Sequence, residues 1–105
     1  MSEPLSLKIL PDKDTALLKV NVSLDMFDKT RFTEECHSLL DKEQKNIVLD
    51  LTKTKRLFSI YLGAIADLHL QCEKAGKSLA LHVNEDLAHI FKQTSFNEFL
   101  TIKIV

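Results

Sequence analysis

Short apolar segments alternate with longer segments of helical pattern along most of this sequence, and that alternation is what most constrains the fold. Three short segments have the length and composition of strands: 47–51 (IVLDL), 78–83 (SLALHV) and 99–105 (FLTIKIV). Longer segments of helical character separate them. Strands that alternate with helices in this way predict a mostly parallel sheet with right-handed crossovers.

An alternating pattern near the N-terminus predicts a hairpin ahead of that unit. In 5–10 (LSLKIL) and 16–22 (ALLKVNV), apolar residues recur at every second position, as in half-buried strands. Pro11 to Asp14 are expected to form the turn between them. The whole chain therefore predicts an α/β fold of order β-β-α-β-α-β-α-β, with about four or five strands and helices packed on the sheet.

Residue types at the ends of the helical segments indicate where each helix begins or stops. Asp28 or Thr30 could cap the first helix, and Asn84 is expected to cap the third. Gly76 stands where a left-handed residue would stop the second helix, which is expected to start at Ser59. The residues on the inward stripes of the three helices are Phe32, Cys36, Leu39 and Leu40; Leu62, Ile65, Ala66 and Cys72; and Leu87, Ile90, Phe91 and Thr94.

The bulk properties of the chain exclude several classes of protein. Its 105 residues are 45% hydrophobic and 28% charged, so we expect a single domain over residues 1–105. A net charge of −1 provides no basic field for nucleic acid. No apolar stretch would span a bilayer and the N-terminus lacks a signal pattern, so we expect a cytoplasmic protein without direct membrane insertion. Cys36 and Cys72 are then expected to be reduced, and a disulfide between them is the remaining alternative.

Four histidines and one strand-end carboxylate are the candidates for chemistry. His69 and Cys72 lie three residues apart on the second helix and could supply two zinc ligands, while Asp50 could act as a base. A structural role is favoured for each, because no further ligand, acid or nucleophile accompanies them. We therefore predict no enzyme, no catalytic residue, no metal and no cofactor, and keep a small enzyme or metal protein as the minor hypothesis.

An apolar turn connects the third strand to the second helix. KRLFSIYLGA (55–64) places one hydroxyl, Ser59, among large apolar residues. Strand-to-helix turns usually carry small or polar residues, because the first helical N–H groups need acceptors. Ser59 could be the N-cap of the helix. One side of a helix cannot bury Phe58, Ile60 and Tyr61 together, so we expect at least one of them at a partner interface.

The stretch from Ile47 to His82 resembles the STAS domain, the family of bacterial anti-sigma factor antagonists. IVLDL (47–51) matches the family strand V-x-L-D-L, which is followed by D-S-S/T-G-L-G at the start of a helix, and Leu62-Gly63 match the L-G. KAGKSLAL (74–81) matches the family's step into the next strand, and VNVSLD (20–25) is similar to its V-x-G-x-L-D. The resemblance covers essentially the whole chain and implies the fold order predicted above.

This resemblance implies a non-enzymatic module that binds an anti-sigma factor or a related histidine-kinase-like ATPase with serine kinase activity. Ser59 falls on the first serine of the motif, which a partner kinase phosphorylates in the family. Phe58, Ile60 and Tyr61 stand in place of the aspartate, the second hydroxyl residue and the glycine, so the phospho-switch departs from the pattern although the acceptor remains. The predicted partner-contact residues are Asp25, Met26, Phe58, Ser59, Ile60 and Tyr61.

The resemblance also permits a second role. The chain would then be the STAS subunit of a membrane ABC transport complex of the phospholipid type, docked on the ATPase, and no phosphorylation would be needed. The altered turn fits this role somewhat better than it fits a phospho-switch. An interpretation of Ser59 as an N-cap alone also stays open.

Overall fold

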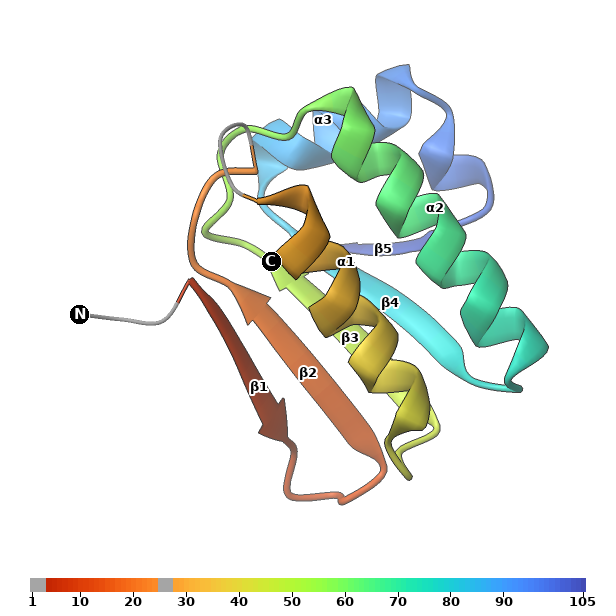
Figure 1. The fold of residues 1–105 in the computed structure, drawn as a ribbon. Helices are drawn as coiled ribbons and strands as arrows, with labels where there is room; N and C mark the ends of the chain where they lie inside the picture. The colour runs from red at the N-terminus through yellow and green to blue at the C-terminus, as the bar shows by residue number, and fades with distance from the viewer. Residues whose placement is uncertain (1–3, 25–27) are drawn as a thin grey trace.

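The computed structural model describes residues 4–24 and 28–105, and its elements follow the predicted order (Figure 1). The strands are β1 (Leu5–Ile9), β2 (Thr15–Val20), β3 (Asn46–Leu51), β4 (Ser78–Val83) and β5 (Thr101–Ile104). The α-helices are α1 (Lys29–Ser38), α2 (Ser59–Lys74) and α3 (Glu85–Gln93), and two short 3₁₀ turns are η1 (Leu39–Asp41) and η2 (Phe96–Glu98). The predicted α/β fold class is confirmed.

One mixed sheet contains all five strands in the order β1-β2-β3-β4-β5. β1 pairs with β2 antiparallel, which is the predicted hairpin, and every other neighbouring pair is parallel. A helix connects each pair of parallel strands, so the carboxyl ends of β2, β3 and β4 lie at the same end of the sheet. The connections that lead into α1, α2 and α3 therefore lie together at that end.

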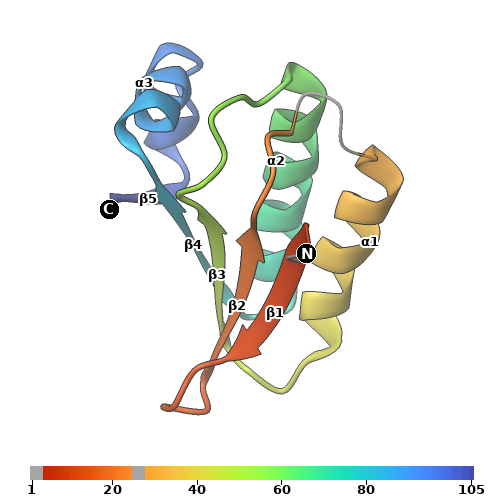
Figure 2. The same ribbon diagram turned by 90° about the vertical axis from the view of Figure 1, so that its left-hand side faces the viewer.

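The core lies on one face of the sheet. The fully buried side chains of the central strands, such as Leu18, Leu49 and Leu81, are direct neighbours in the pairing register and point to the same side. α1 and α2 cover that side (Figure 2). The opposite face carries Asp50 and His82, which are only partly exposed and face each other across β3 and β4.

Helix termini follow the predicted capping residues. Asp28 caps α1 by accepting a hydrogen bond from the Thr30 N–H at 2.9 Å, which settles the choice between those two residues. Gly76 follows the C-cap of α2 with a φ of 71°, the left-handed conformation that glycine adopts without steric cost. The predicted bounds of α2 are correct to within one residue.

Three predicted details of the fold are wrong. Val22 lies beyond the end of β2, and Phe99 precedes β5 because it is the C-cap of the η2 turn. Thr94, placed on the inward stripe of the third helix, is exposed; it is the C-cap of α3, and its hydroxyl donates to the Ile90 carbonyl at 3.0 Å. Serine and threonine often satisfy backbone carbonyls in this way near a helix end.

Asn84 joins α3 to the connection that precedes α2. Its Oδ1 accepts from the Leu87 N–H at 2.9 Å, and its Nδ2 donates to the carbonyls of Thr52 and Thr54 at 3.1 and 2.9 Å. Asn84→Ala is expected to lower the free energy of unfolding by about 2–3 kcal/mol, from a lost cap of about 1 kcal/mol and two lost hydrogen bonds of about 1 kcal/mol each. Urea denaturation followed by circular dichroism measures this change.

A matched control is Asn46→Ala. The Asn46 amide lies exposed at the start of β3 and accepts one hydrogen bond, from the Ser78 hydroxyl at 2.8 Å. This variant is expected to lose less than about 1 kcal/mol. If the two variants lost the same free energy of unfolding, Asn84 would not stabilise the contact between α3 and the connection that precedes α2.

Candidate functional site

The connection between β3 and α2 is held from both sides. Asp50 at the end of β3 accepts hydrogen bonds from the Thr52 N–H at 3.0 Å and the Thr52 hydroxyl at 2.7 Å. Thr54 is fully buried, and its hydroxyl donates to the Val22 carbonyl at 3.0 Å. Asp50 therefore fixes a turn, which is the structural role predicted for it.

A short bridge ties the same connection to the segment after β2. The Leu24 N–H donates to the Arg56 carbonyl at 2.9 Å, and the Phe58 N–H donates to the Leu24 carbonyl at 3.3 Å. Leu24 and Leu57 pair in parallel fashion and both side chains are buried. The backbone that enters α2 is thus anchored up to Phe58, so the residues that follow it are presented from a rigid base.

Phe58, and not Ser59, is the N-cap of α2. Phe58 has extended dihedral angles of −71° and 152°, and its carbonyl accepts from the Tyr61 N–H at 2.9 Å. Ser59 is the first helical residue and its side chain is exposed. The interpretation of Ser59 as an N-cap is therefore wrong, because the extended conformation of a cap falls one residue earlier. A serine at the first helical position leaves its hydroxyl free to face solvent.

The apolar residues around Ser59 divide between the surface and the core. Phe58 is 56% exposed and Ile60 is 51% exposed, whereas Tyr61 is 2% exposed. The Tyr61 ring packs edge-on against Phe32 of α1, with the ring centroids 5.5 Å apart. This corrects the prediction that placed Tyr61 at a partner interface, because its ring completes the core between α1 and α2. The predicted contact residues Asp25 and Met26 lie outside the described residues.

The N-terminal end of α2 suits negative charge. The helix dipole and the first N–H groups give any helix N-terminus a partial positive charge. No acidic residue occupies the first turn of α2, and Lys55 and Arg56 precede it with exposed side chains. Ser59 therefore stands in a local field that favours an anionic group over a neutral one.

A groove between α1 and α2 begins beside Ile60. Its volume is about 430 Å³, and it is lined by Lys29, Thr33, Ile60, Gly63, Ala64 and Asp67. Asp67 pairs with His37 of α1 across a distance of 3.3 Å. The Thr33 Oγ1 is buried and has no hydrogen-bond partner among the described residues. The apolar surface at the N-terminal end of α2, which we call the mouth of α2, is therefore continuous with a groove that has both polar and apolar walls.

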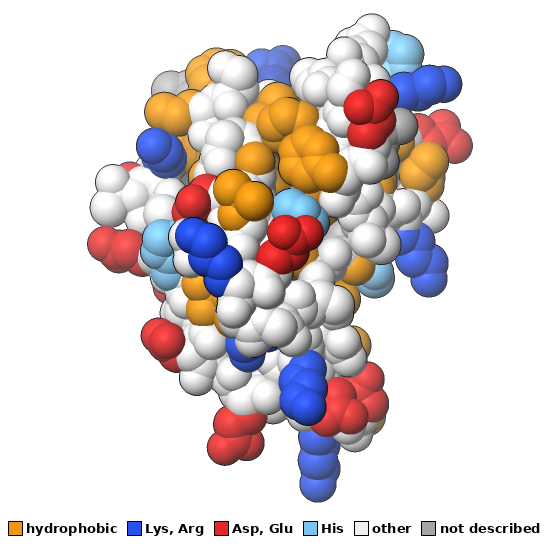
Figure 3. Space-filling view, turned by 90° about the vertical axis from the view of Figure 1, so that its right-hand side faces the viewer, with side chains coloured by type: hydrophobic (Ala, Val, Ile, Leu, Met, Phe, Trp, Pro, Cys, Tyr) orange, Lys and Arg blue, Asp and Glu red, His pale blue; other side chains and the backbone are white. Residues whose placement is uncertain are grey.

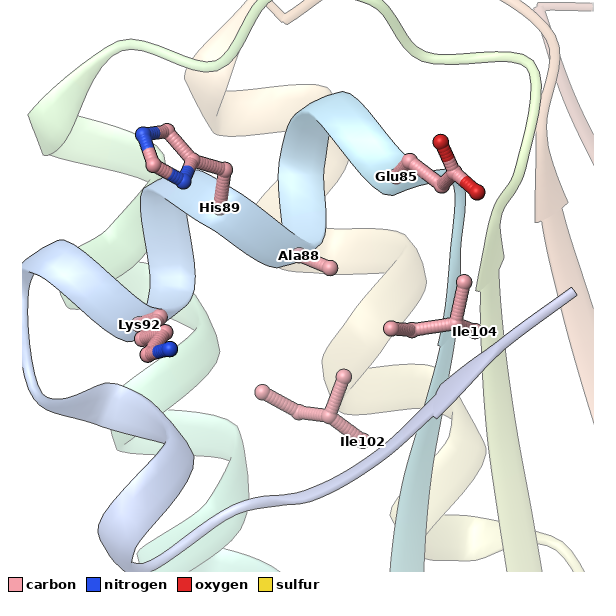
Figure 4. A pocket seen from close by; sticks show the side chains of 6 residues that line it. All are labelled: Glu85, Ala88, His89, Lys92, Ile102 and Ile104. Atoms are coloured by element: carbon pink, nitrogen blue, oxygen red, sulfur yellow. The ribbon is translucent and has the colours of Figure 1, made fainter.

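Two further surface features escaped prediction from the sequence. Leu70 of α2 is 54% exposed and Phe99 is 46% exposed, and the Phe99 ring lies 5.5 Å from the ring of His69. Figure 3, which views the molecule from the right-hand side of Figure 1, shows hydrophobic side chains gathered on its upper part. A second groove, of about 380 Å³, lies between α3 and β5 (Figure 4); its lining residues are Glu85, Ala88, His89, Lys92, Ile102 and Ile104. The sequence pattern had assigned Phe99 to a strand, which concealed its exposure.

The residues considered for metal or acid–base chemistry take ordinary positions. His69 lies 3.1 Å from the Glu73 carboxylate, four residues further along α2. Over residues 4–24 and 28–105, no three His, Cys, Asp or Glu side chains are grouped so that they could hold a metal ion. His69 and Cys72 thus have no third ligand within the described chain.

Cys36 and Cys72 are free and buried, with exposed fractions of 2% and 1%. Burial raises the pKa of the Cys36 thiol to about 12 and also raises the pKa of Cys72. Because the thiolate is the reactive form, we expect neither cysteine of the native protein to react rapidly with a disulfide reagent at about pH 8. Both should react at once after denaturation. Rapid reaction of either thiol in the native protein would contradict this description of the two cysteines.

The fold and the site together define a small α/β module with an exposed apolar and hydroxyl surface at the start of one helix. The sequence matches the STAS domain over residues 8–104, and the chain belongs to the STAS domain family. Its five-stranded mixed sheet with helices is therefore a STAS fold. In the described part of the chain, none of the helices has both the length and the apolar character that crossing a membrane requires.

Solved structures share the fold at low sequence identity. The chain is similar to a proposed anti-sigma factor antagonist from Thermotoga maritima, with a TM-score of 0.81, 23% identity and coverage of 93% of this chain and 84% of that one. It is also similar to an anti-sigma factor antagonist from Mycobacterium paratuberculosis, with a TM-score of 0.81, 13% identity and coverage of 100% and 92%. No curated protein matches the sequence.

Proposed function

We propose that this chain is a non-enzymatic, cytoplasmic binding module that docks on an anti-sigma factor or a related ATPase with serine kinase activity. The N-terminal end of α2 is the contact surface, and it consists of Phe58, Ser59 and Ile60. The observation that carries this proposal is the exposure of Phe58 and Ile60, at 56% and 51%, on either side of an exposed hydroxyl. Large apolar side chains held on a rigid base are typical anchors of protein interfaces.

Ser59 is the proposed phosphorylation position. A phosphoserine at the first position of α2 would meet the positive end of the helix dipole, a gain of about 0.3–1 kcal/mol at an exposed site. The same group would bring nearly two negative charges and their hydration shell onto an apolar contact surface. Phosphorylation would therefore leave the module folded and expel the partner.

A second candidate role is that of the STAS subunit of an ABC transport complex of the phospholipid type. The observation that favours it is the apolar character of the residues on both sides of Ser59, since a permanent contact gains from Phe58 and Ile60 and needs no switch. In that role the same surface binds the transporter ATPase, and Ser59 stays unmodified.

A kinase assay separates the two roles. The chain is incubated with ATP and a histidine-kinase-like ATPase of its host, and phosphate is located by mass spectrometry. The switch predicts phosphate on Ser59, none on the Ser59→Ala variant, and loss of binding after modification. An ATPase that binds the chain but leaves Ser59 unmodified would overturn the switch and favour the transport role. An ATPase whose binding survives complete phosphorylation would also overturn it.

A further inference from the structure

We propose that β1 is a self-pairing edge strand, through which two copies of this chain form a two-fold dimer with one continuous sheet. β1 pairs with β2 on one side, and its other side is the outer edge of the sheet (Figure 1). The occupant of that edge would be β1 of a second copy, in antiparallel orientation. This surface is separate from the mouth of α2 and does not depend on the proposed function.

The edge strand β1 exposes apolar side chains on the face of the sheet that carries the core. Leu7 and Ile9 are 39% and 41% exposed, although they pair with the buried residues Leu18 and Ala16 of β2. They therefore point to the side of the sheet that the helices cover, but α1 lies in front of other strands than β1 (Figure 1), and both side chains stay partly exposed. Natural edge strands usually hide or charge such positions, because an exposed apolar edge invites pairing with another chain.

Hydrogen bonds to β2 show which backbone groups of β1 face outward. The Asn21 N–H donates to the Pro4 carbonyl at 2.8 Å, and the Leu10 N–H donates to the Thr15 carbonyl at 2.9 Å. In an antiparallel pair, residues that exchange hydrogen bonds alternate with residues that do not. Positions 4, 6, 8 and 10 thus face β2, and the N–H and C=O groups of Leu5, Leu7 and Ile9 point away from it.

These outward groups are self-complementary about Leu7. A two-fold axis at that residue pairs Leu7 with Leu7 of the second copy, and Leu5 with Ile9 of the second copy, as hydrogen-bonded pairs. The Leu7 pair sets two exposed apolar side chains against each other on the helix-covered side, the arrangement that stabilises cross-strand contacts, whereas Leu5 is already buried in its own chain at 6% exposure. Pro11 follows the strand at a position of the outward-facing parity and cannot donate, so it limits the ladder to the segment centred on Leu7.

Charge on the edge is compatible with a second copy. Lys8 is the one charged residue between Leu5 and Ile9, and the two-fold register sets it opposite Ser6 of the second copy rather than opposite another lysine. The paired edges are short and would bury less than the roughly 1,200 Å² of a standard stable interface. The dimer is therefore weak and forms with rising protein concentration.

Sedimentation equilibrium of the full chain from about 10 μM to about 1 mM tests the proposal. The unmodified chain is expected to move from monomer to dimer mass over this range. Leu7→Lys should weaken the dimer at least about tenfold, because it places two like charges at the axis. Leu7→Pro should act similarly while leaving the β1–β2 bonds intact, since the N–H it removes points outward.

Ile104→Lys is the matched control, because Ile104 is 57% exposed on β5, the other edge of the sheet. This variant should dimerise as the unmodified chain does, and thermal unfolding should show that all variants fold. A chain that stays monomeric at about 1 mM overturns the proposal. A dimer that Ile104→Lys disrupts and the Leu7 variants do not disrupt also overturns it.

Discussion

Ile60→Glu is expected to weaken binding of the proposed partner ATPase by at least about 30-fold, a loss of about 2 kcal/mol or more. Ile60 is half exposed, stands next to Ser59 and forms part of the wall of the α1–α2 groove. A glutamate there would place an uncompensated charge in the desolvated centre of the interface. The fold should not suffer, because a carboxylate in the first turn of a helix is favourable. Isothermal titration calorimetry of the variant against the ATPase gives the change directly.

Leu70→Glu provides the control for that experiment. Leu70 belongs to the same helix and is 54% exposed, nearly the same fraction as Ile60, but it lies near the other end of α2. This variant is expected to change the dissociation constant less than about threefold. If Leu70→Glu weakened binding as strongly as Ile60→Glu, the contact surface would lie along α2 and not at its start.

Phe32→Ala is expected to lower the free energy of unfolding by about 3–5 kcal/mol, the loss typical of a large aromatic residue removed from a core. Phe32 is fully buried on α1, and its ring is the edge-on neighbour of Tyr61. The truncation would leave a cavity under the first turn of α2 and would remove the contact that fixes Tyr61. Urea denaturation measures the free energy, and the melting temperature should fall in parallel.

Phe58→Ala is the matched aromatic truncation for the stability experiment. Phe58 adjoins the same turn but is 56% exposed, so its loss should change the free energy of unfolding by less than about 0.5 kcal/mol. The same variant should weaken binding of the ATPase. A stability loss as large as that of Phe32→Ala would mean that Phe58 belongs to the core and is not available to a partner.

Much of the fold follows from local patterns in the sequence. The strand and helix order depends on period-two and helical stripes, and both the capping bond of Asn84 to Leu87 and the left-handed Gly76 involve residues close in the chain. Such signals are local, so the sequence carries them directly. The mostly parallel sheet also follows, because each strand after the hairpin is separated from the next by a helix.

The candidate site could be predicted only in part, because it depends on which residues the rest of the fold covers. The sequence pointed to Phe58, Ile60 and Tyr61 as a group, but the position of Phe32 on α1 decides that Tyr61 alone turns inward. The cap of α2 falls on Phe58 because Leu24, distant in sequence, holds the Phe58 backbone extended. Leu7 looked half-buried by its alternating pattern, yet no helix extends over the edge strand to cover it.

An NMR titration of the isotopically labelled chain with its partner ATPase tests the central proposal, that this module docks through the mouth of α2. The amide signals of residues 56–64 should shift or broaden first, together with that of Leu24, which is bonded to this turn. The signals of Lys19, Asp50 and His82 on the open face of the sheet should stay in place. Perturbation confined to that open face, with Ser59 and Ile60 unchanged, would contradict the proposal.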